Sequence, residues 1–141
     1  MTYLKNRLKE MLIENEGLKV HPYKCTAGKL TIGIGRNIES NGITVEEALF
    51  LLDNDINRVM DELYSIFGIS DFKQMPGNVQ IVLCDMCFNL GVNRFLDFKK
   101  MIEAVKKHDW KEMVIQMQDS NWYHQVGDRS KKLVKIIKQL Y

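Results

Sequence analysis

Apolar residues recur at helical spacing near the start of the chain, with lysine, arginine and glutamate between them. This pattern predicts an amphipathic helix over about residues 2–16. Gly17 is suited to end that helix, because glycine readily adopts the backbone conformation of a C-terminal cap. The apolar face of the predicted helix consists of Leu4, Leu8, Met11 and Leu12.

Residues 20–36 have a different pattern. Pro22 and several glycines interrupt short runs of β-branched and aromatic residues, which is typical of a small antiparallel sheet with tight turns. We expect one turn near Ala27–Gly28 and another at Asn41–Gly42.

A long helix is predicted next, from residue 44 to about residue 67, because Thr44 and Glu47 form a capping box at its start. Pro76 then opens a helix over roughly residues 77–90. That helix is apolar on most faces, as expected of a central core helix. Further helices are predicted at about 95–107, 110–118 and 129–140, the second of them with a capping box of Asp109 and Glu112.

Together these elements indicate an α+β fold. A small antiparallel β-lobe over about residues 17–43 is joined by the long helix to a larger helical lobe, which comprises about residues 75–141 and residues 1–16. We expect the whole chain to form a single domain.

Composition and charge narrow the class of protein. The 141 residues are 45% hydrophobic and 27% charged, as is usual for a soluble globular domain. The net charge of +2 is too small for a dedicated nucleic-acid binder, and no apolar run is long enough to span a membrane. The amino end lacks the pattern of a signal peptide, and three cysteines do not suggest a secreted disulfide framework. We expect a monomer made in a reducing cytoplasm, with no nucleic-acid partner and no stable membrane insertion.

Three side chains near the first turn carry candidate chemistry. Glu16 lies where the first helix ends, and the carbonyl end of a helix disfavours a negative charge. This suits a general acid, which must hold its proton, although a solvated surface glutamate fits the same position. Cys25 and Thr31 lie on either side of the hairpin turn, where a thiol and a hydroxyl can polarise one water molecule. A small buried cysteine is the alternative.

The segment "ENEGLKVHPYKCTAGKLTIGIGR" resembles the active-site segment of the phage-type lysozymes, the muramidase endolysins of tailed phages and prophages. The family pattern is Glu-Gly, then Tyr-Lys-Asp-Thr-x-Gly, then Thr-Ile-Gly-Ile-Gly-His. The segments "GITVEEA", "FNLG" and "NWYHQVGDR" are also similar to the family, in the same order and with similar spacing. The resemblance therefore covers nearly the whole chain.

The resemblance implies an inverting hydrolysis of the β-1,4 bond between N-acetylmuramic acid and N-acetylglucosamine in peptidoglycan, without a metal or an organic cofactor. Glu16 corresponds to the general acid, Thr31 to a threonine that orients the attacking water, and Arg129 to an arginine that pairs with the acid. Cys25 stands where most members have an aspartate. The positions that correspond to substrate contacts are Gly35, Asn37, Phe88, Met101 and Gln116. The resemblance also implies that a separate membrane-lesion protein releases the enzyme to the cell wall.

Two departures from the family pattern lead to expectations of their own. A free thiol has a pKa of about 8.5, so Cys25 works as a base only if a neighbouring charge, such as His21 or Lys24, lowers that pKa. Its roles as base, water-positioning group or nucleophile stay open. Arg36 replaces the histidine of Gly-Ile-Gly-His, and we predict that it pairs with Asp55 on the long helix.

The sequence also allows two alternatives to this assignment. The Cys84-x-x-Cys87 pair suggests redox or zinc chemistry, but a single pair inside an apolar helix is better explained by burial in the core. The loss of the aspartate at Cys25 raises the second possibility, a catalytically inactive module that binds peptidoglycan or another glycan. Intact Glu16, Thr31 and Arg129 favour the enzyme.

Overall fold

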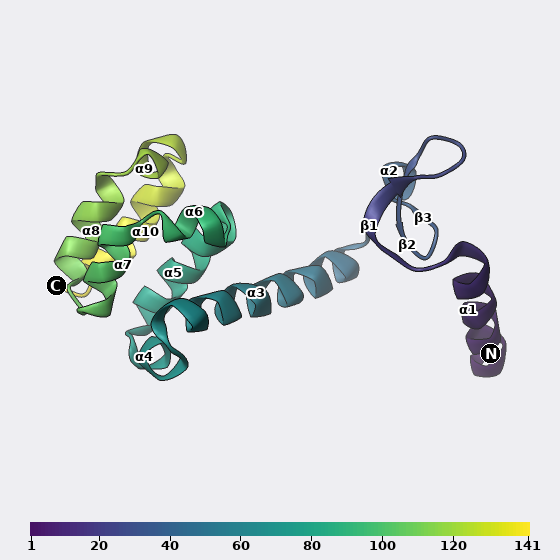
Figure 1. Cartoon of the computed structure of the whole chain (residues 1–141), viewed down its shortest axis with the longest axis horizontal. Coiled ribbons are helices and arrows are strands. Elements are labelled where there is room, and N and C mark those ends of the chain that lie inside the picture. The colour runs from purple at the N-terminus through teal and green to yellow at the C-terminus, as the bar shows by residue number, and fades with distance from the viewer. The chain divides into compact units, whose positions relative to one another are not determined.

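The structure is a computed structural model that describes all residues from 1 to 141, in two compact units, Met1–Phe50 and Leu51–Tyr141. The boundary between them falls within the long helix α3 (Val45–Phe67), which Figure 1 shows in blue-green. The small sheet belongs to the first unit and the large hydrophobic core to the second. That residues 1–16 form part of the helical lobe remains a prediction.

The first unit contains one helix, a three-stranded antiparallel sheet of order β1-β2-β3, and a short helix before α3. The sheet confirms the α+β fold class expected from the sequence. Gly17 ends the first helix at a φ of 76°, with its N–H donating to the carbonyl of Ile13 over 2.8 Å. The elements are α1 (Thr2–Glu16), β1 (Lys19–Lys24), β2 (Leu30–Gly33), β3 (Arg36–Asn37) and α2 (Ile38–Asn41).

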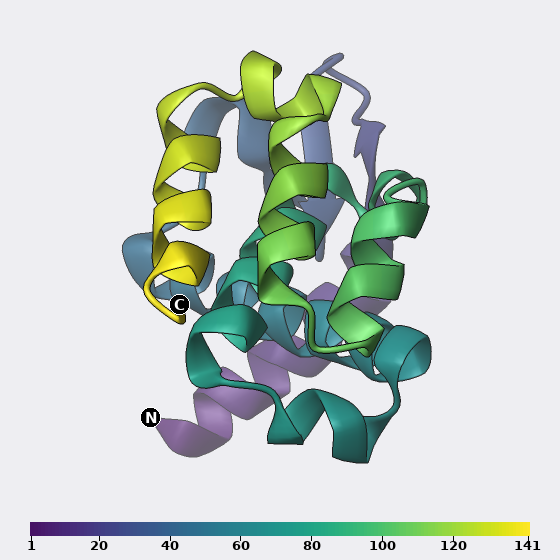
Figure 2. The ribbon, with the colours of Figure 1, turned by 90° about the vertical axis from the view of Figure 1, so that its left-hand side faces the viewer.

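The second unit is all helical. The central helix α5 buries five side chains, which confirms the core role expected of residues 77–90. Figure 2 shows α8 between α7 and α10. The helices are α4 (Ile69–Gln74), α5 (Gly77–Leu90), α6 (Val92–Leu96), α7 (Lys99–Lys106), α8 (Trp110–Gln118), α9 (Asn121–Gln125) and α10 (Asp128–Lys138). None of the helices combines the length and the apolar character that a membrane crossing requires.

One predicted helix proved to be two. The continuous helix expected over 95–107 is divided between α6 and α7 by Asp97 and Phe98. Phe98 leaves the helical conformation, with φ −79° and ψ 54°. Its ring packs edge-on against Trp122, with ring centroids 6.1 Å apart. A tertiary contact therefore accompanies the break in the local helical pattern.

The two predicted capping boxes have different outcomes. At the start of α3, the Glu47 N–H donates to Thr44 Oγ1 over 3.1 Å and the Thr44 N–H donates to Glu47 Oε1 over 2.8 Å, which confirms the box. At α8, Asp109 accepts from the Glu112 N–H, but the return bond is missing. The Asp109 N–H donates instead to the carbonyl of Ala104.

Candidate active site

The turn between β1 and β2 positions Cys25 and Thr31. The Cys25 N–H donates to the carbonyl of Lys29 over 2.9 Å, and the Gly28 N–H donates to the carbonyl of Cys25 over 2.8 Å. These bonds enclose a hairpin loop of three residues, 26–28. Its last residue, Gly28, has a φ of 77°, a left-handed conformation that glycine adopts without strain. The turn expected near Ala27–Gly28 is confirmed.

The strand register places the thiol and the hydroxyl on one face of the sheet. Tyr23 pairs with Thr31 and Thr31 pairs with Asn37, so these three side chains share a face. Cys25 lies two residues beyond Tyr23 and therefore points to the same side. The hairpin thus brings Cys25 and Thr31 together as diagonal neighbours, as the sequence predicted.

Thr31 is the buried polar residue of this face, with 3% of its surface exposed. Its hydroxyl donates to the carbonyl of Lys29 over 2.9 Å. A hydroxyl has a single proton, so the remaining capacity of Thr31 Oγ1 is as an acceptor. The oxygen is therefore suited to receive a hydrogen bond from a water molecule.

The pKa of Cys25 is lowered from its ordinary value, mainly by hydrogen bonding to the backbone N–H of Lys29 and then to that of Ala27. Hydrogen bonds to a charged form favour that form. The expected contribution of His21 or Lys24 does not occur. The pKa is lowered instead by backbone N–H groups of the turn, which point toward the side chain of Cys25, the first residue of the loop.

Glu16 lies against the loop that joins β2 to β3. A Cβ atom placed on Gly35 would be 2.7 Å from Oε2 of Glu16 and 2.9 Å from its Cδ. Contacts below 3.0 Å are closer than real Cβ atoms allow, so the carboxyl group occupies the space that a side chain at position 35 would take. Gly35 also has a φ of 69°. Of the predicted substrate-contact residues, Gly35 is the one that contacts the candidate acid.

Asn37 has a structural role in this region. Its Oδ1 accepts from the Ser40 N–H over 3.0 Å and so caps the short helix α2. The amide nitrogen of Asn37 keeps its donors for other partners. The predicted sugar contact of Asn37 remains a prediction.

Within the first unit Arg36 pairs with Glu47. The predicted Arg36–Asp55 pair would join the two units and remains a prediction. Arg36 Nη1 lies 2.6 Å from Oε1 of Glu47, while Asp55 pairs with Arg58 on its own helix at 3.3 Å. Glu47 precedes Asp55 by eight residues on α3, which is about 12 Å along a helix. The pKa of Glu47 is lowered to about 2, chiefly by the hydrogen bond from Arg36 and then by that from the Thr44 N–H.

In the second unit, Arg129 at the start of α10 binds α5. Its Nε donates to Oδ1 of Asp85 over 2.8 Å, and its Nη2 donates to the Asp85 carbonyl over 3.4 Å. This partner was not anticipated from the sequence, and the pairing of Arg129 with Glu16 remains a prediction. Phe88, half exposed, lines an apolar cleft of about 540 Å³ that also includes Ile81, Asp85 and Arg129.

Met101 and Gln116 line a second cleft of the helical unit, of about 730 Å³. Met101 is only 1% exposed and packs in the core beneath this cleft, whereas Gln116 is half buried and donates to Glu112 over 2.8 Å. Trp122, at the same cleft, donates its indole N–H to Asn89 over 3.1 Å. The sugar contacts predicted for Met101 and Gln116 remain predictions.

The cysteine pair on α5 belongs to the core. Cys87 is buried and Cys84 is partly buried, and burial raises the pKa of both thiols, that of Cys87 to about 11. A raised pKa disfavours the thiolate that redox chemistry and metal binding require. No group of three or more histidine, cysteine or acidic side chains is arranged to hold a metal ion.

Comparison with known proteins agrees with the sequence resemblance. The sequence pattern of the phage lysozyme family matches residues 13–138, a range that contains every candidate site residue. The chain belongs to the phage lysozyme family. It is 28% identical to probable T4-type lysozyme 1 and 26% identical to probable T4-type lysozyme 2 of Dictyostelium discoideum, over 92% of each chain. It is also 29% identical to the pre-baseplate central spike protein of Enterobacteria phage T4, over 91% of this chain and 27% of that protein.

Family membership supports a lysozyme-type function and peptidoglycan as the substrate. Two features of the candidate site were not predicted from the sequence: the backbone amides that lower the Cys25 pKa, and the pairing of Arg129 with Asp85. The amides of Lys29 and Ala27 act through the geometry of the turn, and Asp85 acts through packing between α5 and α10. The hairpin pattern could have predicted the role of the amides, because successive N–H groups in a tight turn point to the same side.

Proposed function

We propose that this member of the phage lysozyme family is a muramidase that hydrolyses the β-1,4 bond between N-acetylmuramic acid and N-acetylglucosamine. The observation that carries the proposal is the contact of the Glu16 carboxyl group with Gly35, in the same unit as the Cys25 and Thr31 pair. An acid on one side and a water-binding pair on the other are the groups that glycoside hydrolysis requires.

The proposed reaction inverts the configuration at the anomeric carbon. Glu16 donates its proton to the glycosidic oxygen as the bond from that oxygen to the anomeric carbon breaks. Water attacks the opposite face, and its oxygen forms the new bond to the anomeric carbon while the proton that it loses passes to solvent, from which Glu16 regains its own proton. The thiolate form of Cys25 accepts a hydrogen bond from this water, and Thr31 Oγ1 accepts another, so that the water oxygen points at the sugar.

The thiol at position 25 is compatible with this role. The lowered pKa of Cys25 increases the thiolate fraction near neutral pH, and a thiolate polarises water more strongly than a thiol does. Positioning water needs a fixed acceptor rather than a strong base. We therefore assign Cys25 a water-positioning role, in preference to that of a nucleophile.

The decisive test uses Glu16→Gln, with Glu14→Gln as its matched control. Both residues are exposed and lie near the end of α1, and both changes remove one charge while keeping the shape. Clearing of a peptidoglycan suspension should be abolished by Glu16→Gln and unchanged by Glu14→Gln, because glutamine has no proton to donate. Normal clearing by folded Glu16→Gln protein would refute the assignment of the acid.

Product analysis tests the stereochemistry separately. An inverting enzyme acting on a β-bond first releases the α-anomer, which proton NMR detects before mutarotation mixes the anomers. Initial release of the β-anomer would contradict inversion and point to a covalent intermediate. A protein that binds insoluble peptidoglycan but releases no product would be the inactive binding module instead.

The place of action is also a proposal. Three free thiols are consistent with synthesis in a reducing cytoplasm, since cysteines remain unpaired there. We propose that the enzyme is made in the host cytoplasm and acts on the cell wall after release by a separate membrane-lesion protein. Expression with and without such a protein, followed by measurement of culture lysis, tests this.

A further inference from the structure

The carboxyl group of Glu16 lies against the short loop that joins β2 to β3. The loop between β2 and β3 contains Gly33 and Gly35, both with positive φ, at 72° and 69°. Glycine adopts many backbone conformations, so contacts beyond the β2–β3 ladder help to keep the loop in one of them. The Glu16 carboxyl group occupies the space that a side chain on Gly35 would take, so the position of this loop limits where the candidate acid can lie.

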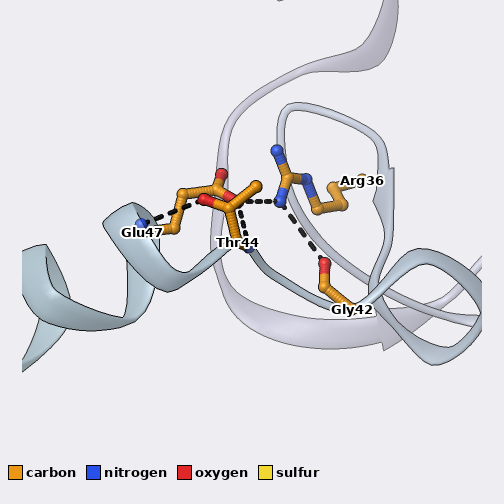
Figure 3. A network of polar contacts seen from close by, with 4 residues as sticks. All are labelled: Arg36, Gly42, Thr44 and Glu47. Carbon is orange, nitrogen blue, oxygen red and sulfur yellow. Dashed lines mark hydrogen bonds and ion pairs between the residues drawn. The ribbon is translucent and has the colours of Figure 1, made fainter.

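Arg36, the next residue in the sequence, connects this loop to the start of α3. Arg36 comes directly after Gly35, and consecutive Cα atoms are held about 3.8 Å apart. The guanidinium of Arg36 donates through Nη1 to Oε1 of Glu47 over 2.6 Å and to the carbonyl of Gly42 over 3.3 Å. These bonds connect β3 to the segment that begins α3, as Figure 3 shows.

Glu47 is itself fixed by the helix that it caps. The same Oε1 atom that binds Arg36 also accepts the N–H of Thr44 over 2.8 Å, and the Glu47 N–H returns a bond to Thr44 Oγ1. The carboxylate therefore cannot follow Arg36 if the loop moves. A helix terminus, a carboxylate, a guanidinium and a glycine form one continuous connection that ends at Glu16.

We propose that Glu47 and Arg36 are positioning residues for Glu16: through Gly35 they hold the carboxyl group where it donates its proton. This inference rests on the proposed role of Glu16 as the general acid. The ion pair is about 40% exposed on each side, and pairs so exposed contribute little to folding stability. Its loss should therefore affect the rate of the chemical step far more than the fold.

The test compares Arg36→Met, Arg36→Lys and Glu47→Gln with Glu46→Gln as the matched control. Glu46 is the adjacent acidic residue of α3, exposed and without a side-chain hydrogen bond or ion pair. Glutamine at position 47 keeps an oxygen for the capping box but loses the charge that holds Arg36. Folding of every variant is checked by circular dichroism and thermal melting.

We expect Arg36→Met to lower kcat for a soluble peptidoglycan fragment by about ten- to a hundredfold, because a misplacement of the order of 1 Å has effects of this size. KM should stay within about twofold, since an interaction that matters only in the transition state changes kcat and not KM. Arg36→Lys should restore part of the rate and Glu46→Gln should change nothing. The double variant Arg36→Met/Glu47→Gln should lose no more than Arg36→Met alone, because the two residues act as a unit.

Several results would overturn the inference. An unchanged kcat in folded Arg36→Met protein would do so, and so would additive losses in the double variant. If Arg36→Met does not fold, Glu47→Gln decides the question, and a normal kcat in that variant counts against the proposal. The proposed function fails separately: an inactive wild-type protein, or an active Glu16→Gln variant, would refute the muramidase assignment, whereas active wild type with an unaffected Arg36→Met variant refutes only the positioning role.

Discussion

The substitution Gly35→Ala is expected to affect the free energy of unfolding and the catalytic rate by different amounts. The added Cβ would lie 2.7 Å from Glu16 Oε2, whereas ordinary contacts begin at 3.4 Å. To restore an ordinary contact distance, the carboxyl group must move away from the new Cβ by about 0.7 Å. Because that group is the far end of a flexible side chain, the movement costs little stability. The backbone is a separate matter, since alanine at a φ of 69° costs roughly 1–2 kcal/mol.

The expected result is a variant of moderately reduced stability and strongly reduced activity. We expect the free energy of unfolding to fall by roughly 1–2 kcal/mol, from the backbone strain. The rate of peptidoglycan clearing per folded molecule should fall by about tenfold or more, because the acid is displaced by a large part of 1 Å. Urea denaturation measures the first quantity and initial clearing rates measure the second.

Gly68→Ala provides the control. Gly68 also has a positive φ, 86°, but a Cβ there would meet nothing within 4 Å, and the residue lies between α3 and α4. This variant should lose similar stability from the same kind of strain and keep its clearing rate. Equal activity losses in the two variants would show that backbone strain alone is responsible. Full activity of Gly35→Ala would show that Glu16 is not held by its contact with Gly35.

Other predictions follow from the thiols and the ion pairs. Iodoacetamide should modify Cys25 before Cys84 and Cys87, because its pKa is lowered while burial raises theirs, and clearing should stop as Cys25 reacts; mass spectrometry of the peptides identifies the site. Cys25→Asp should keep or raise the clearing rate and Cys25→Ala should lose most of it, so full activity of the alanine variant would remove Cys25 from the mechanism. The folded-state pKa of Glu47 is lowered to about 2, so its ion pair contributes stability above pH 4.5, its ordinary pKa, and loses it as the pH falls toward 2. Melting temperatures of wild type and Glu47→Gln should accordingly differ by a constant amount above pH 4.5 and converge in acid, and a difference that persists in acid would contradict this.

The helices and the sheet were predictable where the periodic pattern is long. The core helix α5 and the long helix α3 have enough residues for their apolar spacing to be recognised. The short helices α2, α4 and α9 were missed, because four to six residues do not complete a recognisable period. The break at Phe98 was also missed, since it coincides with a contact to Trp122 that lies far along the chain.

The placement of Cys25 and Thr31 beside one turn was predictable from the sequence, whereas the roles of the candidate site residues remain predictions. The pattern of Glu16, Cys25 and Thr31 follows from local sequence and from a hairpin whose turn glycine is evident. The pairing of Arg36 with Glu47 was not predicted, because several acidic residues of α3 are available and only the geometry of the loop selects Glu47. Local patterns identify which side chains form a hairpin, whereas the choice among nearby charges depends on distances that the sequence does not contain.

The geometry of the first turn explains how a cysteine can occupy the position of the aspartate in the family pattern Tyr-Lys-Asp-Thr-x-Gly. Backbone N–H groups of Lys29 and Ala27 stabilise a negative charge on whichever side chain opens this loop. A carboxylate needs no such help to be ionised near neutral pH, but a thiol does. Because the stabilising groups belong to the backbone, they persist when the side chain changes. The loop therefore favours the anionic form of a water-binding group at position 25 with either residue, which is why Cys25→Asp is expected to remain active and Cys25→Ala is not.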